Sequence, residues 1–496
     1  MKLNPAAPPS GTIRDWLQAR ALGGGTAVVF PENGTSLRWE ELRSAARRFA
    51  SALTQRGLKK GESLAIVAPN SREAVIAFYG AVYGGFRATL INLAAGRDAI
   101  GYALLHSDAR FAYVHDSCRT LFDQANTGGV LSIPLDAAEG VALFGVAAED
   151  HALLMYTSGT TGRPKGVVHT HASLLAGGWT TTIAHALNDA DRGFCVLPVY
   201  HINGLCVTVM GALVSGGSLA MVSKFSASRF WDQADAGGVT WFSVVPTIIS
   251  HLLHGAAEPS DACKAQLRFG RSASSALAVE TQTAFENRFD VPIIETMGLT
   301  ETAAQILSNP LPPATRKIGS PGIAFGCAVA IQATDGAEVP RGTEGEIVVR
   351  GPNTLLEYLK NAEATAATFR NGWLRTGDLA RMDEDGYVFV TGRLKELIIK
   401  GGENIAPREI DEALYSHPDV VEAAAFARPC GSYGERVEAA VRLRDGAMLN
   451  AAALIDLCRE RVGPFKSPDA VHFLDELPKG PSGKIQRLKL AELIPL

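Results

Sequence analysis

An alternation of short apolar runs with amphipathic stretches, which extends to about residue 300, constrains the fold more than any other feature of the chain. The segment 39–57 places Leu42, Ala46 and Phe49 on one face of a helix, and Gly57 follows as a stop signal. The next run, SLAIVAPN, predicts a buried strand, and SREAVIAFYGAVYGG predicts the helix after it. Strands that alternate with helices predict wound α/β layers around largely parallel sheets. Further strands are expected at ATLINL, HALLMY, GFCVLPV, SLAMVS, TWFSVV and VPIIET.

A different pattern begins after Gly319, where the short β runs EGEIVVRG and GYVFVTG are separated by turn signals. Beyond Arg393 the chain predicts a compact α+β unit of about 100 residues, which is enough for a small domain. Because 496 residues exceed what one hydrophobic core supports, we expect a domain boundary near 393–396. The small unit has helices at PREIDEALYSH and NAAALIDLCRERV and strands at VEAAAFA, RVEAAVRL and AVHFLDEL.

Charge and cysteine content narrow the class of protein. The net charge of -4 argues against a dedicated nucleic-acid binder and fits a small-molecule substrate. Seven cysteines, with no pair at CxxC spacing, predict neither a disulfide framework nor a zinc site, and they indicate a reducing compartment. The sequence shows no signal peptide and no apolar run long enough for a membrane span. We therefore expect a cytoplasmic protein, either a monomer or a homodimer.

The stretch YTSGTTGRPKGVV, residues 156–168, has the composition of a phosphate-binding loop. Gly159 and Gly162 allow close approach of the backbone, whose N–H groups then form an anion nest, and Lys165 adds a positive charge. A Walker A loop has a helix starting at its lysine, whereas here Pro164 removes a backbone donor and the following VVH predicts a strand. The loop therefore predicts a phosphate site of another kind. A polar hairpin loop without a ligand is the alternative.

The longer string YTSGTTGRPKGVVHTH closely resembles the signature of the adenylate-forming superfamily, which comprises acyl-CoA synthetases, luciferases and the adenylation domains of peptide synthetases. The resemblance covers nearly the whole chain, because further motifs follow in the family's order. It implies that the loop grips the β- and γ-phosphates of ATP. The residues that match are Thr157, Ser158, Gly159, Thr160, Thr161 and Lys165.

The resemblance also implies a domain organisation. A large domain of wound α/β layers with a β-barrel-like subdomain is expected over 1–392, and it binds ATP and the acid. A hinge is expected over 393–396. A small mobile α+β domain over 397–496 carries the catalytic lysine and rotates between the two steps of the reaction.

The motif ETMGLTE resembles the family's YGxTE motif, in which the threonine contacts the α-phosphate and the glutamate binds magnesium. These residues are Thr300 and Glu301, and one carboxylate with phosphate oxygens and water is chemically sufficient for Mg²⁺. Met297 stands where the family usually has an aromatic residue against adenine, so the contact is softer. Further nucleotide contacts are expected from Glu295, Thr296, Ser275 and Ala276, and contacts with the acid from Gly298 and Ser272.

Three more motifs resemble those of the family. VYHINGL places His201 beside the acyl pocket and ATP, and LRTGDL places Asp378 on the ribose hydroxyls. GRLKELIIKGGENIAPREI implies Arg393 on the ribose and Lys395 as the pivot of the hinge, and LPKGPSGKIQR implies that Lys484 is the catalytic lysine. In the same stretch, Gly401 and Gly402 match the positions where the pantetheine arm of CoA enters.

The implied reaction joins two anions. A carboxylate attacks the α-phosphorus of ATP to give an acyl-adenylate and pyrophosphate, and a thiol then releases AMP. Positioning and charge stabilisation supply most of the catalysis, with Lys484 bridging the two reactants. Free CoA is the simplest thiol; loading of a separate carrier protein, amide formation and a catalytically inactive nucleotide-binding protein are the alternatives.

The acid is indicated by LRFGRSASSAL, residues 267–277, which resembles most the branch that contains oxalyl-CoA synthetases. Arg271 in this string could hold a second anionic group, which favours a short acid such as oxalate or sulfoacetate. A structural ion pair is the alternative role for Arg271. Apolar residues near the expected pocket, such as Trp241 and Val245, would instead suit medium-chain or aryl acids.

Overall fold

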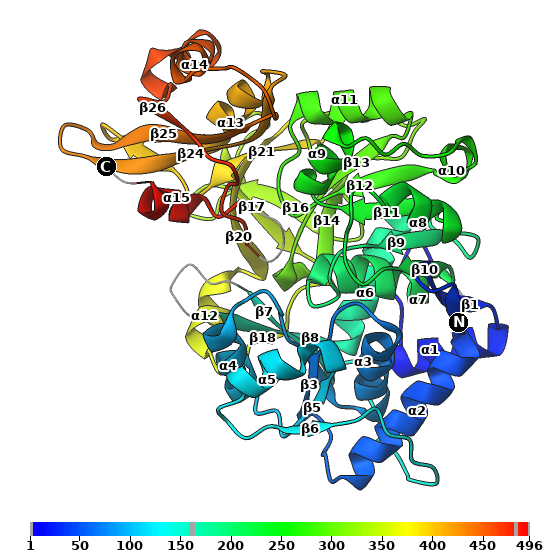
Figure 1. The fold of residues 1–496 in the computed structure, drawn as a ribbon. Helices are drawn as coiled ribbons and strands as arrows, with labels where there is room; N and C mark the ends of the chain where they lie inside the picture. Colours follow the sequence, from blue (N-terminus) through cyan, green and yellow to red (C-terminus); the bar gives the residue numbers. More distant parts are fainter. Residues whose placement is uncertain (1–2, 158–163, 481–484, 495–496) are drawn as a thin grey trace.

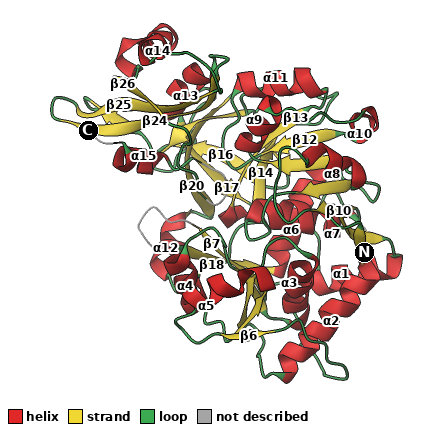
Figure 2. Ribbon diagram, viewed as in Figure 1, coloured by secondary structure: helices red, strands yellow, loops and turns green. Residues whose placement is uncertain are grey.

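The computed structural model describes residues 3–157, 164–480 and 485–494. A large N-terminal domain holds three sheets, and a smaller C-terminal domain holds a fourth (Figure 1). Helices and strands interleave throughout the large domain (Figure 2). The fold class predicted from the sequence is confirmed.

The first sheet has seven strands in the order β18-β8-β7-β4-β3-β5-β6. The five strands from β7 to β6 are parallel neighbours, and β8 and β18 are added antiparallel at one edge. Parallel strands are covered by helices on both faces, which accounts for the continuous apolar run SLAIV. The strands are β3 (Ser63–Val67), β4 (Arg87–Leu90), β5 (Phe111–Val114), β6 (Leu131–Ile133), β7 (His151–Thr157), β8 (Lys165–Thr170) and β18 (Glu357–Tyr358); the helices nearby in sequence are α1 (Ile13–Gly23), α2 (Trp39–Gln55), α3 (Arg72–Gly84), α4 (Arg97–His106) and α5 (Arg119–Ala125).

The second sheet has nine strands in the order β15-β14-β13-β12-β11-β9-β10-β1-β2. Its central strands from β13 to β1 are parallel, and both edges are antiparallel. The strands are β1 (Thr26–Phe30), β2 (Thr35–Arg38), β9 (Arg192–Cys195), β10 (Ser218–Met221), β11 (Trp241–Val244), β12 (Phe269–Ser272), β13 (Ile293–Leu299), β14 (Ala304–Ser308) and β15 (Ile323–Ala324). The helices are α6 (His171–Ala184), η2 (Asn203–Met210), α7 (Gly211–Ser215), α8 (Phe230–Ala236), α9 (Pro246–His254), α10 (Asp261–Gln266) and α11 (Val279–Phe289).

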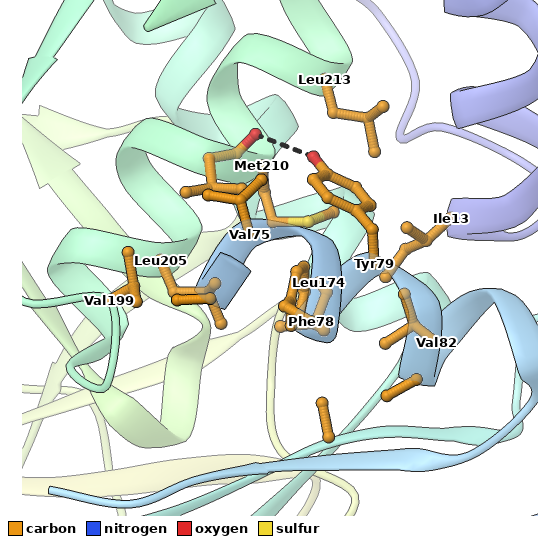
Figure 3. Close-up of a cluster of buried hydrophobic side chains, with 14 of the residues drawn as sticks. Ile13, Val75, Phe78, Tyr79, Val82, Leu174, Val199, Leu205, Met210 and Leu213 are labelled. Carbon is orange, nitrogen blue, oxygen red and sulfur yellow. Dashed lines mark hydrogen bonds between the residues drawn. The ribbon is translucent and has the colours of Figure 1, made fainter. Parts of the chain in front are cut away.

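The core that joins these two sheets is built around α3 and α6, which are buried on nearly all sides. One continuous cluster of buried side chains contains residues of both helices together with Leu64 of β3 and Leu219 of β10. In Figure 3, Tyr79 of α3 lies among these side chains, and its hydroxyl donates to the carbonyl oxygen of Val209 at 3.4 Å. The two sheets therefore share one core.

The pattern after Gly319 forms a five-stranded antiparallel sheet. The hairpin of β20 and β21 places Asp378 opposite Arg393. The elements are β16 (Ala328–Gln332), β17 (Gly345–Arg350), α12 (Ala362–Thr368), β19 (Phe369–Arg370), β20 (Trp373–Met382) and β21 (Val388–Arg393).

The small domain has a sheet in the order β23-β22-β25-β24, with β26 parallel to β25. Between β21 and β22 lie residues 394–397, which overlap the hinge predicted over 393–396; the hinge and the domain boundaries stay a prediction. The elements are β22 (Ile398–Lys400), β23 (Glu403–Ile405), α13 (Pro407–Tyr415), β24 (Val420–Cys430), β25 (Gly434–Leu443), α14 (Ala451–Lys466), β26 (Ala470–Phe473) and α15 (Arg487–Leu493). In the part of the chain that the structure describes, no helix has the length and apolarity needed to cross a membrane.

Candidate active site

A cavity of 220 Å³ lies between the large and small domains. The large domain contributes the second half of β13, the middle of β20, the end of β21 and the segment after β12, and the small domain contributes α13 and residues near the C-terminus. Nucleotide-binding residues predicted from separate motifs therefore meet in one place. The predicted residues that line the cavity are Ser275, Ala276, Glu295, Thr296, Met297, Gly298, Asp378 and Arg393.

The corner between β13 and β14 requires glycine. A β-bulge lies between Met297 and Gly298, and a Cβ atom on Gly298 would meet the carbonyl oxygen of Ala304 at 1.7 Å. The short η3 helix (Thr300–Thr302) follows and holds Thr300 and Glu301. Close backbone packing therefore fixes where these two side chains leave the sheet.

His169 anchors this corner from the neighbouring sheet. Burial lowers the pKa of its imidazole to about 4, so the ring is neutral at pH 7. With the proton on Nε2, the ring donates to the carbonyl oxygen of Thr300 at 2.6 Å, and its Nδ1 accepts from the hydroxyl of Ser173, 3.0 Å away. His169 belongs to the VVHTH end of the loop motif, so a signal was present in the sequence, but no role was predicted for it.

Tyr358 connects the loop to Glu301. Its hydroxyl donates to the Glu301 carboxylate at 2.8 Å, and the Lys165 ammonium lies 4.8 Å from the centre of its ring. Thr157 and Lys165 face each other across β7 and β8, at the base of the predicted phosphate loop. The predictions for Ser158, Gly159, Thr160 and Thr161 fall outside the described residues.

Glu301 fits a magnesium ion whose other ligands are phosphate and water. It supplies one hard carboxylate, which is only partly buried, and Mg²⁺ commonly binds one or two carboxylates together with substrate phosphates. Within the described ranges, no group of three or more histidine, cysteine, aspartate or glutamate side chains could hold a metal by itself. The protein residues therefore suit an ion that arrives with the nucleotide.

Asp378 and Arg393 form a bidentate ion pair across β20 and β21. Although burial would lower the pKa of Arg393, the Asp378 carboxylate outweighs this effect and the pKa is raised. Asp378 is buried and both residues line the cavity. The pair presents a fixed carboxylate and a fixed guanidinium at one wall, which suits hydroxyl groups of a ribose.

Glu295 is a buried carboxylic acid on another wall. Burial raises its pKa to about 7, and Arg408 and the backbone N–H of Leu277 partly offset that rise. Its Oε1 accepts from Leu277 at 3.2 Å, whereas its buried Oε2 has no hydrogen-bond partner among the described residues. Near pH 7 this group therefore changes charge readily, and its second oxygen is left for a ligand.

Arg271 is buried behind the cavity, only 1% exposed, and its hydrogen bonds go to neutral side chains. Its Nη1 donates to Asn203 Oδ1 at 2.8 Å and to Ser243 Oγ at 3.0 Å, and its Nε donates to Gln305 Oε1 at 3.2 Å. In the described ranges, no carboxylate lies at ion-pair distance from Arg271, so the structural ion pair considered above is not present there. Burial lowers the pKa of the guanidinium to about 9.

A short path of side chains joins Arg271 to the cavity. Asn203 also donates to the hydroxyl of Ser274, which lines the cavity, at 3.3 Å. Ser274 has a φ of 76°, an uncommon conformation for a residue other than glycine and one often found at functional sites. Next to Arg271, the buried hydroxyl of Ser272 has no hydrogen-bond partner in the described part of the chain.

The remaining predicted residues lie outside the lining of the cavity or outside the described residues. His201 lies on the approach to η2, two residues before Asn203, and its ring meets that of Tyr200 edge-on at 5.0 Å. Gly401 and Gly402 form the exposed turn between β22 and β23, both with positive φ, and Lys395 is exposed between the domains. Lys484 falls outside the described residues, but the nearby Ile485 and Arg487 line the cavity.

Known proteins resemble this chain over almost its whole length. It matches the AMP-binding enzyme family over residues 16–359 and the AMP-binding enzyme C-terminal domain over residues 409–484. Sulfoacetate–CoA ligase of Cupriavidus necator is 43% identical over 93% of this chain and 94% of its own. Oxalate–CoA ligase of Arabidopsis thaliana is 34% identical over 93% of both chains.

Solved structures agree with this likeness. ATP-bound MatB from Rhodopseudomonas palustris has a TM-score of 0.89 and 30% identity, covering 97% of this chain and 99% of its own. The apo form of MatB from the same organism gives a TM-score of 0.77. The structure is therefore closer to the ATP-bound form than to the apo form.

Proposed function

Because this chain belongs to the AMP-binding enzyme family, we propose that it uses ATP to join a small acid with a second anionic group to CoA. Sulfoacetate and oxalate are the acids that best fit. The first step forms an acyl-adenylate and pyrophosphate, and the second forms the thioester and releases AMP.

The observation that carries the choice of acid is the unbalanced charge of Arg271. An isolated charge inside a protein is costly unless something pairs with it. The described residues around Arg271 supply only neutral acceptors. A sulfonate or second carboxylate would supply the missing anion, and a planar fork suits either group.

The cavity residues divide the nucleotide between them. Asp378 and Arg393 hold the ribose hydroxyls, and Ser275, Ala276 and Met297 form the wall for the base. Thr300 contacts the α-phosphate, and the loop with Lys165 takes the departing pyrophosphate. Magnesium, when bound, neutralises phosphate charge, and Glu301 is the residue that would hold it.

Two negative reactants must approach each other in the first step, so a cation between them is required. We assign this role to Lys484. His201 stays assigned to the acid side, because Asn203 in the same motif contacts Arg271. Gly401 and Gly402 remain the proposed entrance for the pantetheine arm, and Lys395 the pivot. Seven free thiols support a reducing, cytoplasmic location, and the protein stays proposed as a monomer or homodimer.

A panel of acids tests the proposal. AMP release with CoA is measured for sulfoacetate, oxalate and malonate, and for acetate, cinnamate and octanoate as acids with one anionic group. We expect kcat/KM to be about 100-fold higher for the best dianionic acid, because a buried charge pair is typically worth a few kcal/mol. A preference for cinnamate or octanoate would assign the pocket to apolar acids instead. AMP release that needs a carrier protein or an amine in place of CoA would change the acceptor.

A further inference from the structure

One helix of the small domain makes several polar contacts at once with the large domain. Pro407 begins α13, and the helix carries Arg408 and Glu412 one turn apart. Arg408 Nε lies 3.4 Å from Glu412 Oε1, and both side chains line the cavity. We call these two residues the α13 pair.

Arg408 donates across the boundary between the domains. Its Nη1 donates to the carbonyl oxygen of Val390 in β21 at 2.7 Å, and its Nη2 donates to that of Gly319 at 3.3 Å. These bonds are directional, and each is strengthened by the charge of the donor. The Arg408 guanidinium therefore binds two segments of the large domain and fixes the small domain relative to them.

Glu412 faces the start of α11 in the large domain. Burial raises the pKa of its carboxyl, and Arg408 and the backbone N–H of Val279 partly offset the rise. Val279 is the first residue of α11, where N–H groups are available to an anion. The α13 pair thus contacts the large domain through both its cation and its anion, and the two contacts are neighbours because Gly319 lies against Val279.

The same helix positions the end of the chain. Asp411 lies between the members of the pair and accepts from Arg487, with 2.5 Å between Oδ2 and Nη2. Arg487 also lies 3.5 Å from Glu396 in the predicted hinge, and it follows Lys484 by three residues. Asp411 therefore links α13, which packs on the large domain, to Arg487 at the cavity.

We propose that Arg408 is a positioning residue for acyl-adenylate formation. With Glu412 it seats the small domain on the large domain so that Ile485 and Arg487 lie at the cavity. The inference rests on the proposed function, because it assigns the residue to one of its two steps. Thioester formation from a supplied acyl-adenylate does not bring two anions together, so it needs this seating less.

The test separates the two half-reactions in Arg408→Ala. Pyrophosphate exchange driven by the acid reports the first, and thioester formation from synthetic acyl-adenylate and CoA reports the second. We expect exchange to fall about 10- to 100-fold, since hydrogen bonds to a charged group are lost, and thioester formation to change less than about 3-fold. Equal losses in both, or no loss in exchange, would overturn the proposal.

Two further variants make the result specific. Arg408→Lys keeps the charge but cannot donate to both carbonyls from one planar fork, so we expect an intermediate loss of exchange. Arg459→Ala removes an exposed arginine of α14 whose partner, Asp456, lies in its own helix, and it should leave both half-reactions unchanged. A loss in Arg459→Ala equal to that in Arg408→Ala would show a general effect of removing charge from the small domain.

A readout without turnover distinguishes this proposal from the proposed function. Trypsin cleavage at the exposed Lys395 in the presence of ATP is compared between Arg408→Ala and the unmodified chain. Faster cleavage in the variant, with an unchanged Tm, supports the seating role even if no acid in the panel reacts. Equal cleavage rates would contradict it, whichever acid proves to be the substrate.

Discussion

Two buried arginines, one in each domain, are held in opposite ways. Arg271 in the large domain has neutral partners: Asn203, Ser243 and Gln305. Arg428 in the small domain is 3% exposed and pairs with the buried Glu438, with 3.0 Å between Nε and Oε2.

The difference shows what each charge is for. Arg428 also donates to the carbonyl oxygens of Ala491 and Ile494 at 2.9 and 3.0 Å, so its charge is balanced and its fork ties α15 to β24. Arg271 donates only to neutral side chains, so these partners do not balance its charge. A buried cation whose anion is supplied by the chain is structural, whereas one without such an anion favours a charged ligand.

Replacing Arg271 should give the largest effect on activity. In Arg271→Met we expect kcat/KM for the dianionic acid to fall about 100- to 1,000-fold, because the buried partner of its second anion is lost. The free energy of unfolding should fall by less than in Arg428→Met, because the loss of the donor to Asn203, Ser243 and Gln305 is partly offset by removal of an unbalanced buried charge. Steady-state kinetics and urea unfolding measure the two. Large destabilisation with normal kinetics would show that Arg271 has a structural role and does not bind the acid.

Arg428→Met should lower stability and leave activity on dianionic acids unchanged. We expect the small domain to lose about 2–4 kcal/mol of stability, because two carbonyls and part of Glu438 lose their donor. Glu438 keeps Arg436 and His472, at 2.6 and 2.9 Å, which limits the loss. Hydrogen exchange of β24 and β25 measures it. A selective loss of activity on dianionic acids, with normal exchange, would contradict a structural role.

A smaller effect is expected when the chain itself supplies an anion to Arg271. Gln305 accepts from Arg271 at 3.2 Å, so Gln305→Glu would place a carboxylate at ion-pair distance. We expect kcat/KM for the dianionic acid to fall about 10- to 100-fold, with acetate affected less, because the internal anion competes with the substrate. Gln305→Met is the matched control, since it removes the hydrogen bond without adding charge. Equal losses in both variants would locate the effect in the hydrogen bond.

The sequence predicted the cavity wall but not the surroundings of Arg271. Asp378 and Arg393 belong to motifs that the chain preserves almost intact, so their places could be inferred one by one. Asn203, Ser243 and Gln305 come from three elements far apart in sequence, and neutral polar residues inside apolar runs carry no local signal of what they hold. Their role depends on strand order, which periodicity does not specify.

The ends of helices and strands show the same contrast: some follow from the local sequence, and others depend on contacts far away in the chain. The helix predicted at PREIDEALYSH is α13, which begins at Pro407 and buries one apolar face. The strand predicted at GFCVLPV ends at Cys195, before Pro198, which cannot donate to a neighbouring strand. The strand predicted at VEAAAFA extends to Cys430 because β25 pairs with it to the end. Long-range pairing therefore decides what composition leaves open.

The smallest expected effect is on the pH dependence of stability. It concerns two buried glutamates, one without a cationic partner at ion-pair distance in the described residues and one with such partners, as in the comparison of the two arginines. Glu295 is 2% exposed with its pKa raised to about 7 by burial, whereas Glu438 is 1% exposed and its hydrogen bonds from His472, Arg436 and Arg428 outweigh burial and lower its pKa. A raised pKa means that the folded chain binds a proton which the unfolded chain has released, so stability falls as pH rises between about 4.5 and 7.

Glu295→Gln should remove that loss. We expect its Tm relative to the unmodified chain to rise by a few degrees between pH 5 and pH 8, corresponding to about 1–2 kcal/mol. Glu438→Gln should instead show a Tm difference from the unmodified chain that is nearly constant between pH 5 and pH 8, because a lowered pKa contributes stability that is fully present above about pH 4.5 and is lost only as pH falls below it. Thermal unfolding of both variants at the two pH values measures the contrast. A Tm difference for Glu295→Gln that does not depend on pH would mean that Glu295 is already ionised at pH 5, and the cavity would then hold a fixed negative charge facing the nucleotide.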